Sequence, residues 1–345
     1  MTTDFEIFTE SQTKPGKIRC GDSYQYKILN GNNKELLLLV VSDGVSTSKD
    51  DHLASNTTCE TIIKEFQSSS GYIKERMTIS VENTNSEVRN IDENFGNHSA
   101  TLLFVIWEIN ENKIYYVSVG DSRIFKYSNN EFELLTEDDK ESVLLKIGGE
   151  TVMVNGTPKF AQALTKYMGM VTRVEKDIFE TNFFPGESII LATDGIHNNG
   201  NLPGNLKDII ESNNLEKELK IFVNDCKETF DDDSTIVILR RKYMEKDFKE
   251  IIESVLQKKI DFRSKNIPIL VISDYFIRKI LELLRNTEKE DIYKELKQIL
   301  QYILSFRIIY QRKIFKDLYS EFLKLNVKNL KIHNLFLDII RKSTD

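Results

Sequence analysis

The sequence predicts an α+β fold in which antiparallel sheets are stacked in layers and covered by helices, followed by an all-helical C-terminal region. Short apolar runs rich in β-branched and aromatic residues recur through the first 240 residues, and pairs of amphipathic segments separate them. Strand signals stop after residue 241. Strands interleaved with helix pairs are typical of sheets that helices cover.

Six apolar runs are predicted strands. Residues 35–44 and 99–109 are apolar almost throughout, so both faces of their sheet should be covered. The breaks after residues 109 and 120 have the character of hairpin turns, which predicts antiparallel pairing of the strands on either side. The predicted strands are residues 35–44, 99–109, 113–121, 122–127, 187–195 and 234–241.

Helical periodicity separates these strands. Apolar residues recur every three or four positions in residues 53–67 and 72–91, and a second pair of helices is predicted within residues 202–230. From about residue 243 every segment is helical in its periodicity. We therefore divide the chain into a domain over residues 1–244 and a helical C-terminal regulatory or docking module over residues 245–345.

The composition limits the kind of site the protein can carry. No secretory signal is visible and no run approaches the roughly 18 apolar residues of a membrane span, so we expect a cytoplasmic protein without a membrane partner. The 3 cysteines are widely spaced and there are only 4 histidines. Oxygen is therefore the main ligand for any metal, which favours hard cations such as Mg²⁺ or Mn²⁺.

Charge is divided unevenly along the chain. Residues 241–345 carry 23 basic and 15 acidic side chains, which leaves 24 basic and 39 acidic ones in residues 1–240. The basic residues of the C-terminal region alternate with acidic and apolar ones, as on ordinary solvated helices, so we expect no nucleic-acid binding. Their excess positive charge instead suits docking on the acidic domain or on an acidic protein partner.

Aspartates stand at the ends of several apolar runs. Asp43 and Asp194 each end a run and precede glycine, and Asp121 ends another. Asp22 and the triplet at residues 231–233 precede the runs that follow them. A single Asp-Gly pair is ordinary turn chemistry. Five such carboxylates gathered at one end of a sheet would repel one another, and a divalent cation is the usual compensation.

Seven sequence blocks within roughly residues 14–241 resemble, in order, the motifs of the metal-dependent protein serine/threonine phosphatases of type 2C. The blocks are KIRCGDSY, VVSDGVST, NHSATLLFVI, VGDSRIFKY, ALTKYMG, PGESIILATDGIHNN and DDDSTIVIL. The resemblance implies a four-layer α-β-β-α sandwich, in which two antiparallel sheets flanked by helices carry a two-metal centre at one end.

The resemblance also implies the ligands of that centre. Asp43 would bridge two Mn²⁺ or Mg²⁺ ions, and the carbonyl group of Gly44 would bind one of them. Asp194 and Asp232 would bind the other ion.

The resemblance assigns less direct roles to two further aspartates. Asp22 would act through bound waters, and Asp121 would join Asp194 around a weaker third ion. Within the aspartate triplet, Asp231 and Asp233 stay open as alternatives to the ligand assigned above.

The phosphate-binding arginine of the family has two candidates here. Lys17 falls in its register and Arg19 stands two residues on; a lysine supplies charge but no bidentate fork. We expect no histidine general acid, and His52 is predicted to be an exposed residue at a helix start. Arg123 should brace its turn by pairing with carboxylates, and Trp107 should lie in the core.

The resemblance implies an enzyme that hydrolyses phosphoserine and phosphothreonine in proteins through a metal-bridging hydroxide. Its partners would be a phosphorylated protein and a cognate serine/threonine kinase, with a further protein partner for the helical tail. The alternative is a catalytically weak relative that binds or scaffolds phosphoproteins through that tail. Degenerate relatives lose metal ligands, and all five aspartate positions are filled here, which favours the enzyme.

Overall fold

The fold was analysed in a computed structural model of the chain. It describes residues 5–242, apart from 32–33, 47–49, 93–97, 110, 129–130, 149, 156, 199–203, 213 and 227–231, together with Asn334. The predicted all-α C-terminal module and its boundary at residues 244 and 245 lie outside the described residues and stay predictions.

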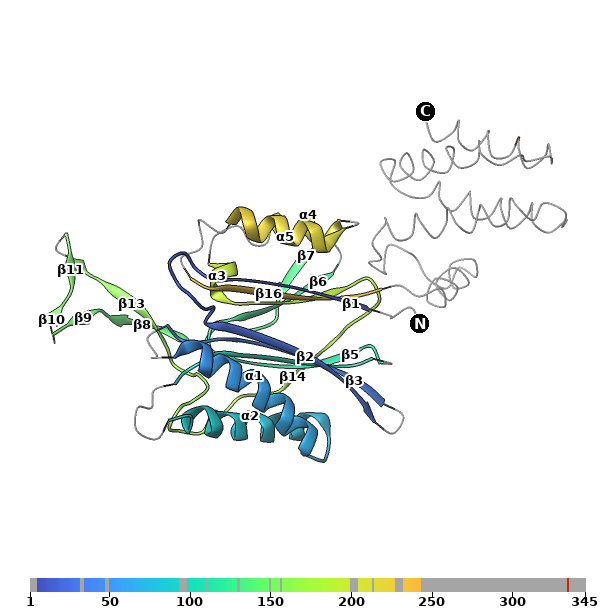
Figure 1. Cartoon of the computed structure of the whole chain (residues 1–345), viewed down its shortest axis with the longest axis horizontal. Helices are drawn as coiled ribbons and strands as arrows, with labels where there is room; N and C mark the ends of the chain where they lie inside the picture. The colour runs from blue at the N-terminus through green and yellow to red at the C-terminus, as the bar shows by residue number, and fades with distance from the viewer. Residues whose placement is uncertain are drawn as a thin grey trace. The chain divides into compact units, whose positions relative to one another are not determined.

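Two five-stranded antiparallel sheets form the centre of the domain (Figure 1). Sheet A consists, in spatial order, of β1 (Phe5–Gln12), β16 (Ser234–Arg241), β15 (Ser188–Ala192), β6 (Arg123–Ser128) and β7 (Glu131–Leu134). Sheet B consists of β14 (Phe179–Asn182), β5 (Lys113–Val119), β4 (Leu102–Glu108), β3 (Lys34–Asp43) and β2 (Asp22–Gly31). The six predicted strands are all present, and β1, β2, β7 and β14 are additional.

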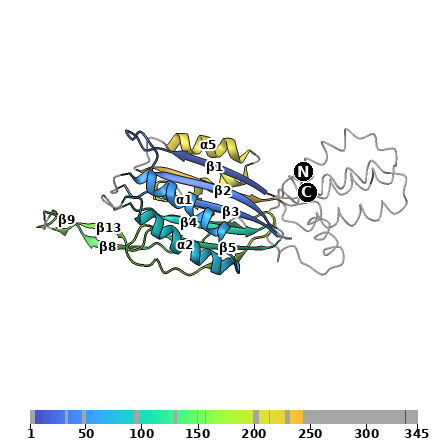
Figure 2. The same cartoon turned by 60° about the horizontal axis from the view of Figure 1, so that its bottom comes forward.

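Helices cover the outer face of each sheet, as Figures 1 and 2 show. α1 (Asp51–Ser68) and α2 (Ile73–Arg89) pack on sheet B, and α4 (Gly204–Glu211) and α5 (Leu215–Cys226) pack on sheet A. Both predicted helix pairs are therefore confirmed. A single-turn helix, α3 (Asp194–His197), follows β15. Within the described part of the chain, each helix is too short or too polar to span a bilayer.

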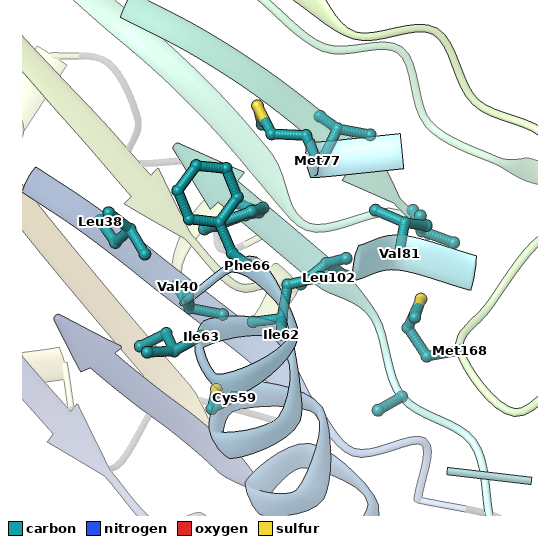
Figure 3. Close-up of a cluster of buried hydrophobic side chains, with 14 of the residues drawn as sticks. Leu38, Val40, Cys59, Ile62, Ile63, Phe66, Met77, Val81, Leu102 and Met168 are labelled. Carbon is teal, nitrogen blue, oxygen red and sulfur yellow. The ribbon is translucent and has the colours of Figure 1, made fainter. Parts of the chain in front are cut away.

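Three apolar cores separate the four layers, because the strands in the middle of each sheet are buried on both faces. Along β3, Leu38 and Val40 face α1 and α2, where they meet Phe66 (Figure 3). Leu37 and Leu39 point the other way, into the core between the sheets. This alternation confirms the four-layer α-β-β-α sandwich.

Trp107 lies in the core between the sheets, as predicted. Its side chain is fully buried and meets Phe5 and Phe183 edge-on, with ring centroids 5.5 and 5.3 Å away. Its indole N–H donates to the carbonyl oxygen of Glu111, so the one polar atom of this side chain is satisfied inside the core.

One of the two predicted hairpins is wrong. β4 and β5 pair as expected, with Leu102 opposite Val119. β5 and β6, however, belong to different sheets, so residues 120–122 carry the chain from sheet B to sheet A. Gly120 turns there with φ of 100°, and an added Cβ would lie 2.7 Å from Thr101. A strand-turn-strand pattern predicts the turn but not which sheet the second strand joins.

No strand is predicted over residues 140–164, where the structure forms a long β-ribbon, here called the arm. β8 (Lys140–Leu144) pairs with β13 (Phe160–Leu164), and the ribbon branches into two short hairpins. The hairpins are β9 (Lys146–Ile147) with β10 (Glu150–Thr151), and β11 (Met153–Val154) with β12 (Thr157–Pro158). Figure 1 shows the arm projecting from one end of the sandwich. The Gly-Gly and Asn-Gly pairs at 148–149 and 155–156 are the signals that could have located these hairpins.

Candidate metal centre

Two of the predicted ligands lie directly opposite each other in sheet B. β2 begins at Asp22, β3 ends at Asp43, and the antiparallel register pairs these two residues. Directly opposed residues have Cβ atoms roughly 4.5–5.5 Å apart, and like charges in such pairs are destabilising. The strand pairing therefore imposes an electrostatic cost at this end of the sheet.

Sheet A brings further carboxylates to the same end. Ala192, at the end of β15, lies opposite Ile236, so Asp194 follows β15 beside the residues that precede β16. The charges of both Asp194 and Asp232 act on Asp43. The structure therefore gathers carboxylates from both sheets at one end of the sandwich.

A hydrogen bond between the sheets holds this end together. The hydroxyl group of Thr193 donates to the Asp22 carboxylate at 2.8 Å, and its oxygen accepts the Thr235 N–H at 2.9 Å. All three residues are buried. Thr193 thus fixes one oxygen of Asp22 from the opposite sheet.

Asp43 lies between the other carboxyl groups. Burial and the charges of Asp22, Asp194 and Asp232 raise its pKa well above the ordinary range. It is also within hydrogen-bonding reach of both Asp22 and Asp194, which come from different sheets. A carboxylate at this central position can contact two ions.

Two carboxyl oxygens in the cluster are buried and have no hydrogen-bond partner, namely Oδ1 of Asp22 and Oδ1 of Asp194. Burial raises the pKa of Asp22 to about 7. Burial, together with the charges of Asp121 and Asp232, raises that of Asp194 to about 6. Unsatisfied buried carboxylates are costly, and a hard divalent cation is the partner that suits oxygen donors of this kind.

The cluster is not a preformed cage. Among the described residues, no three side chains of histidine, cysteine, aspartate or glutamate form a ready set of metal ligands. The strand ends therefore bring the carboxyl groups together without forming a complete set of ligands among the described residues.

The Asp-Gly pairs are required by close backbone contacts. A Cβ on Gly44 would lie 2.1 Å from the carbonyl oxygen of Asp51, at the start of α1. A Cβ on Gly195 would lie 2.1 Å from the carbonyl oxygen of Asp233. Glycine therefore lets α1 and β16 close around the carboxylates, in addition to any role in a turn.

Asp121 reaches the cluster because residues 120–122 cross between the sheets. Its charge raises the pKa of Asp194, and Lys140 at the root of the arm lies 3.9 Å from its carboxylate. The carbonyl oxygen of Asp121 is 3.0 Å from Nε2 of His197. Burial lowers the pKa of His197 to about 4.

Arg123 braces the crossing by pairing with a carboxylate, as predicted. Its guanidinium donates to both oxygens of Asp138, at 2.9 and 2.7 Å, and Lys140 lies 2.8 Å from the same carboxylate. The next residue, Asp139, accepts the Gly120 N–H at 3.0 Å. The root of the arm is thereby fastened to the turn that carries Asp121.

The members of the aspartate triplet differ in their surroundings. Asp233 is buried and accepts hydrogen bonds from the ammonium group of Lys17 and from the backbone N–H groups of Lys14 and Gly21. Asp232 is more exposed and pairs with the Lys14 side chain at 3.3 Å. Asp231 lies outside the described residues.

The two candidate phosphate-binding residues also stand in different surroundings. Lys17 donates to Asp51 at 2.6 Å and to Asp233; these bonds outweigh burial and raise its pKa. Arg19 is exposed and lies 3.3 Å from Nε2 of His52, which is half-buried at the start of α1 rather than exposed as predicted. Sequence reasoning missed Asp51, because it lies 34 positions after Lys17 and no motif links the two.

Together, the fold and the cluster define an α-β-β-α sandwich protein with an oxygen-donor site at one end. The sequence model of the family Protein phosphatase 2C matches residues 14–231, which is more than half of the chain. The chain belongs to the protein phosphatase 2C family. No curated protein sequence matches it.

Solved structures share the fold at low sequence identity. The serine/threonine phosphatase of S. agalactiae is 18% identical with a TM-score of 0.55, covering 69% of this chain and 100% of its own. The PPM Ser-Thr phosphatase MsPP from Mycobacterium smegmatis, solved with cacodylate, is 19% identical with a TM-score of 0.51. The match covers 69% of this chain and 99% of MsPP. The catalytic domain of the phosphatase PstP, solved with 2 manganese ions, is 14% identical with a TM-score of 0.51, covering 69% and 99%.

The Arg123–Asp138 pair generates a pH prediction. Burial alone would raise the pKa of Asp138, but hydrogen bonds from Arg123 and Lys140 lower it to about 2. Because this value lies below the unfolded value of about 3.9, the pair stabilises the fold above about pH 4 and its contribution is lost as the pH falls towards 2. Asp138→Asn should therefore lower the free energy of unfolding near neutral pH, and the deficit should shrink in acid.

Urea unfolding of the full chain at about pH 7 and about pH 3 measures both deficits. Asp208→Asn, on the exposed face of α4, is the control that loses a charge outside this network. A deficit for Asp138→Asn that is equal at the two pH values would show that the charge of Asp138 contributes nothing.

Proposed function

We propose that the protein is a metal-dependent phosphatase that hydrolyses phosphoserine and phosphothreonine in proteins. One observation carries the proposal: Asp22, Asp43 and Asp194 converge from both sheets with raised pKa values, and two of their buried oxygens have no partner. Membership of the protein phosphatase 2C family supports the reaction class. PstP was solved with manganese ions and MsPP with cacodylate, and both observations support a phosphatase site that takes divalent cations and a tetrahedral oxyanion.

The residues present suit two Mn²⁺ or Mg²⁺ ions. Asp43 would bridge the two ions. The carbonyl group of Gly44 would bind one ion, and Asp194 and Asp232 would bind the other. The half-buried carboxylate of Asp232 fits this role better than that of its neighbour Asp233, which is buried and accepts hydrogen bonds from Lys17, Lys14 and Gly21.

Two further aspartates would complete the centre. Asp22 would act through bound waters, and Asp121 together with Asp194 would hold a weaker third ion. When bound, the two main ions supply positive charge for the phosphoryl oxygens and lower the pKa of the water that attacks phosphorus.

In this proposal, Arg19 binds and orients the phosphate. Lys17 is held by Asp51 and Asp233, so its charge is already neutralised by the protein. Arg19 is exposed, and its planar guanidinium can bind two phosphate oxygens at once. Lys17 then has a structural role, because it fastens the loop before β2 to α1 and to the start of β16.

Four expectations rest on this function and stay predictions. They are a phosphoprotein substrate, a cognate serine/threonine kinase, a cytoplasmic location, and a protein partner for the helical region beyond residue 244.

The metal centre generates the main activity prediction. Turnover of a phosphopeptide should require Mn²⁺ or Mg²⁺ and stop in excess chelator. Asp43→Asn and Asp194→Asn should each lower kcat by more than the roughly 10–100-fold that loss of an outer-shell partner costs, because each removes ligand charge at constant volume. Asp208→Asn, the exposed control on α4, should keep wild-type turnover.

Steady-state kinetics with metal added back after chelation measure these changes, and near-ultraviolet circular dichroism checks the fold of each variant. Turnover in excess chelator, with the metal content verified as nil, would contradict the proposed mechanism. Wild-type turnover by either ligand variant would show that the centre is misassigned.

The two basic residues generate a second prediction. Arg19→Ala should raise KM for the phosphopeptide about 10-fold or more, as loss of a charged hydrogen bond does, and leave the unfolding temperature unchanged. Lys17→Met should instead lower the unfolding temperature, because it leaves the buried Asp233 without its cation. A raised KM and wild-type stability for Lys17→Met, with no effect of Arg19→Ala, would reverse the two assignments.

A further inference from the structure

Asp121 and Asp194 are held close together although their charges repel. They come from different segments: Asp194 opens α3, and Asp121 lies in the crossing between β5 and β6. The charge of Asp121 raises the pKa of Asp194, which places the two carboxyl groups within electrostatic reach. A contact between α3 and the crossing would oppose this repulsion.

His197 makes such a contact. Its side chain is buried, with 7% exposed, and Nε2 lies 3.0 Å from the carbonyl oxygen of Asp121. A carbonyl oxygen can only accept a hydrogen bond, so Nε2 carries the proton and donates it. The backbone of Asp121 is thereby tied to the last residue of α3.

The same short helix therefore contacts Asp121 at two points. Asp194 and His197 are three residues apart in α3, a spacing that places both side chains on one face of a helical turn. His197 donates a hydrogen bond to the carbonyl oxygen of Asp121, and the charge of the Asp121 carboxylate acts on Asp194. A hydrogen bond thus links the backbone of Asp121 to the short helix that carries Asp194.

The other side of the crossing is held by the root of the arm. Asp139 accepts the Gly120 N–H at 3.0 Å and donates its own N–H to the Gly120 carbonyl group at 2.8 Å. These contacts fix Gly120, one residue before Asp121. His197 contacts the carbonyl group of Asp121 itself.

Packing alone does not account for the histidine. Its second ring nitrogen, Nδ1, is buried and has no hydrogen-bond partner, so the imidazole carries a desolvation cost that an apolar side chain would avoid. Leucine or phenylalanine would fill a buried site at lower cost. The donor at Nε2 is the property that those residues lack.

We infer that His197 is a positioning residue that sets the spacing of Asp121 and Asp194 and so determines the affinity of this pair for a divalent cation. The inference rests on the proposed function, because it takes the two carboxylates as ligands of the weaker ion. It assigns no contact between His197 and the metal or the substrate.

Calorimetric titration of the metal-free full chain with Mn²⁺ tests this directly, and Mn²⁺ electron paramagnetic resonance counts the bound ions. Wild-type protein should show tight binding and a separate weak phase. His197→Leu should weaken the weak phase about 10-fold or more, as loss of an outer-shell partner does, with the tight phase unchanged. Asp121→Asn should weaken the same phase.

Two further variants separate the hydrogen bond from packing. His197→Gln keeps a side-chain N–H donor and should restore much of the weak-phase affinity that His197→Leu loses. His98→Leu is the matched control, because His98 is also a buried histidine, 6% exposed, whose Nδ1 has no partner. It should leave the weak phase at wild-type affinity even if it lowers the unfolding temperature.

Each outcome bears on a different claim. A weak phase that is unchanged in His197→Leu, or equally weakened in His197→Leu and His197→Gln, overturns the role of the hydrogen bond. Tight binding without a weak phase in the wild type overturns this inference alone. A wild-type chain that binds no Mn²⁺ overturns the proposed function as well.

Discussion

Repulsion among carboxylates at one end of the sandwich is the constraint on which the rest of this structure depends. The register of β2 and β3 sets Asp22 against Asp43, and the ends of β15 and β16 add Asp194 and Asp232. Some of this negative charge is compensated within the protein. Lys14 and Lys17 engage the aspartates before β16, and Thr193 donates across the sheets. The negative charge that is not compensated raises the pKa values of Asp22 and Asp194, and one buried oxygen of each has no hydrogen-bond partner. Such oxygen donors suit a hard cation.

The apolar layers allow the fold to carry this cluster. β3 is buried on both faces along most of its length, so its position is determined by two cores before its last residue reaches Asp43. Close contacts at Gly44 and Gly195 then bring α1 and β16 against the carboxylates. The elements that hold the ligands are thus fixed by hydrophobic burial, which does not depend on the charge state of the cluster.

The sequence was sufficient to predict the layers and to single out five aspartates at strand ends, because apolar periodicity and strand-end carboxylates are local patterns. The role of these aspartates as metal ligands stays a prediction. It was insufficient where the outcome depends on contacts between distant segments. The turn at residues 120–122 is visible in the sequence, but its crossing from sheet B to sheet A is decided by packing. Likewise, the pairing of Lys17 with Asp51 and the contact of His197 with Asp121 join segments that no motif connects. The charge of Lys17 suggested a phosphate ligand, whereas its two carboxylate partners favour a structural role.

The central claim is that the buried carboxyl groups of the cluster are partly protonated and bind a divalent cation. Proton release on metal binding tests this claim most directly. Groups with raised pKa values hold protons near neutral pH, and a cation that binds their ionised form must displace them. Calorimetric titration with Mn²⁺ in two buffers of different ionisation enthalpy gives the number of protons released. We predict release of about one proton or more near pH 6.5, where Asp22 with a pKa of about 7 is mostly protonated, and less release as the pH rises towards 9. Binding of Mn²⁺ without proton release across this range would show that the carboxyl groups are already ionised and would contradict the account.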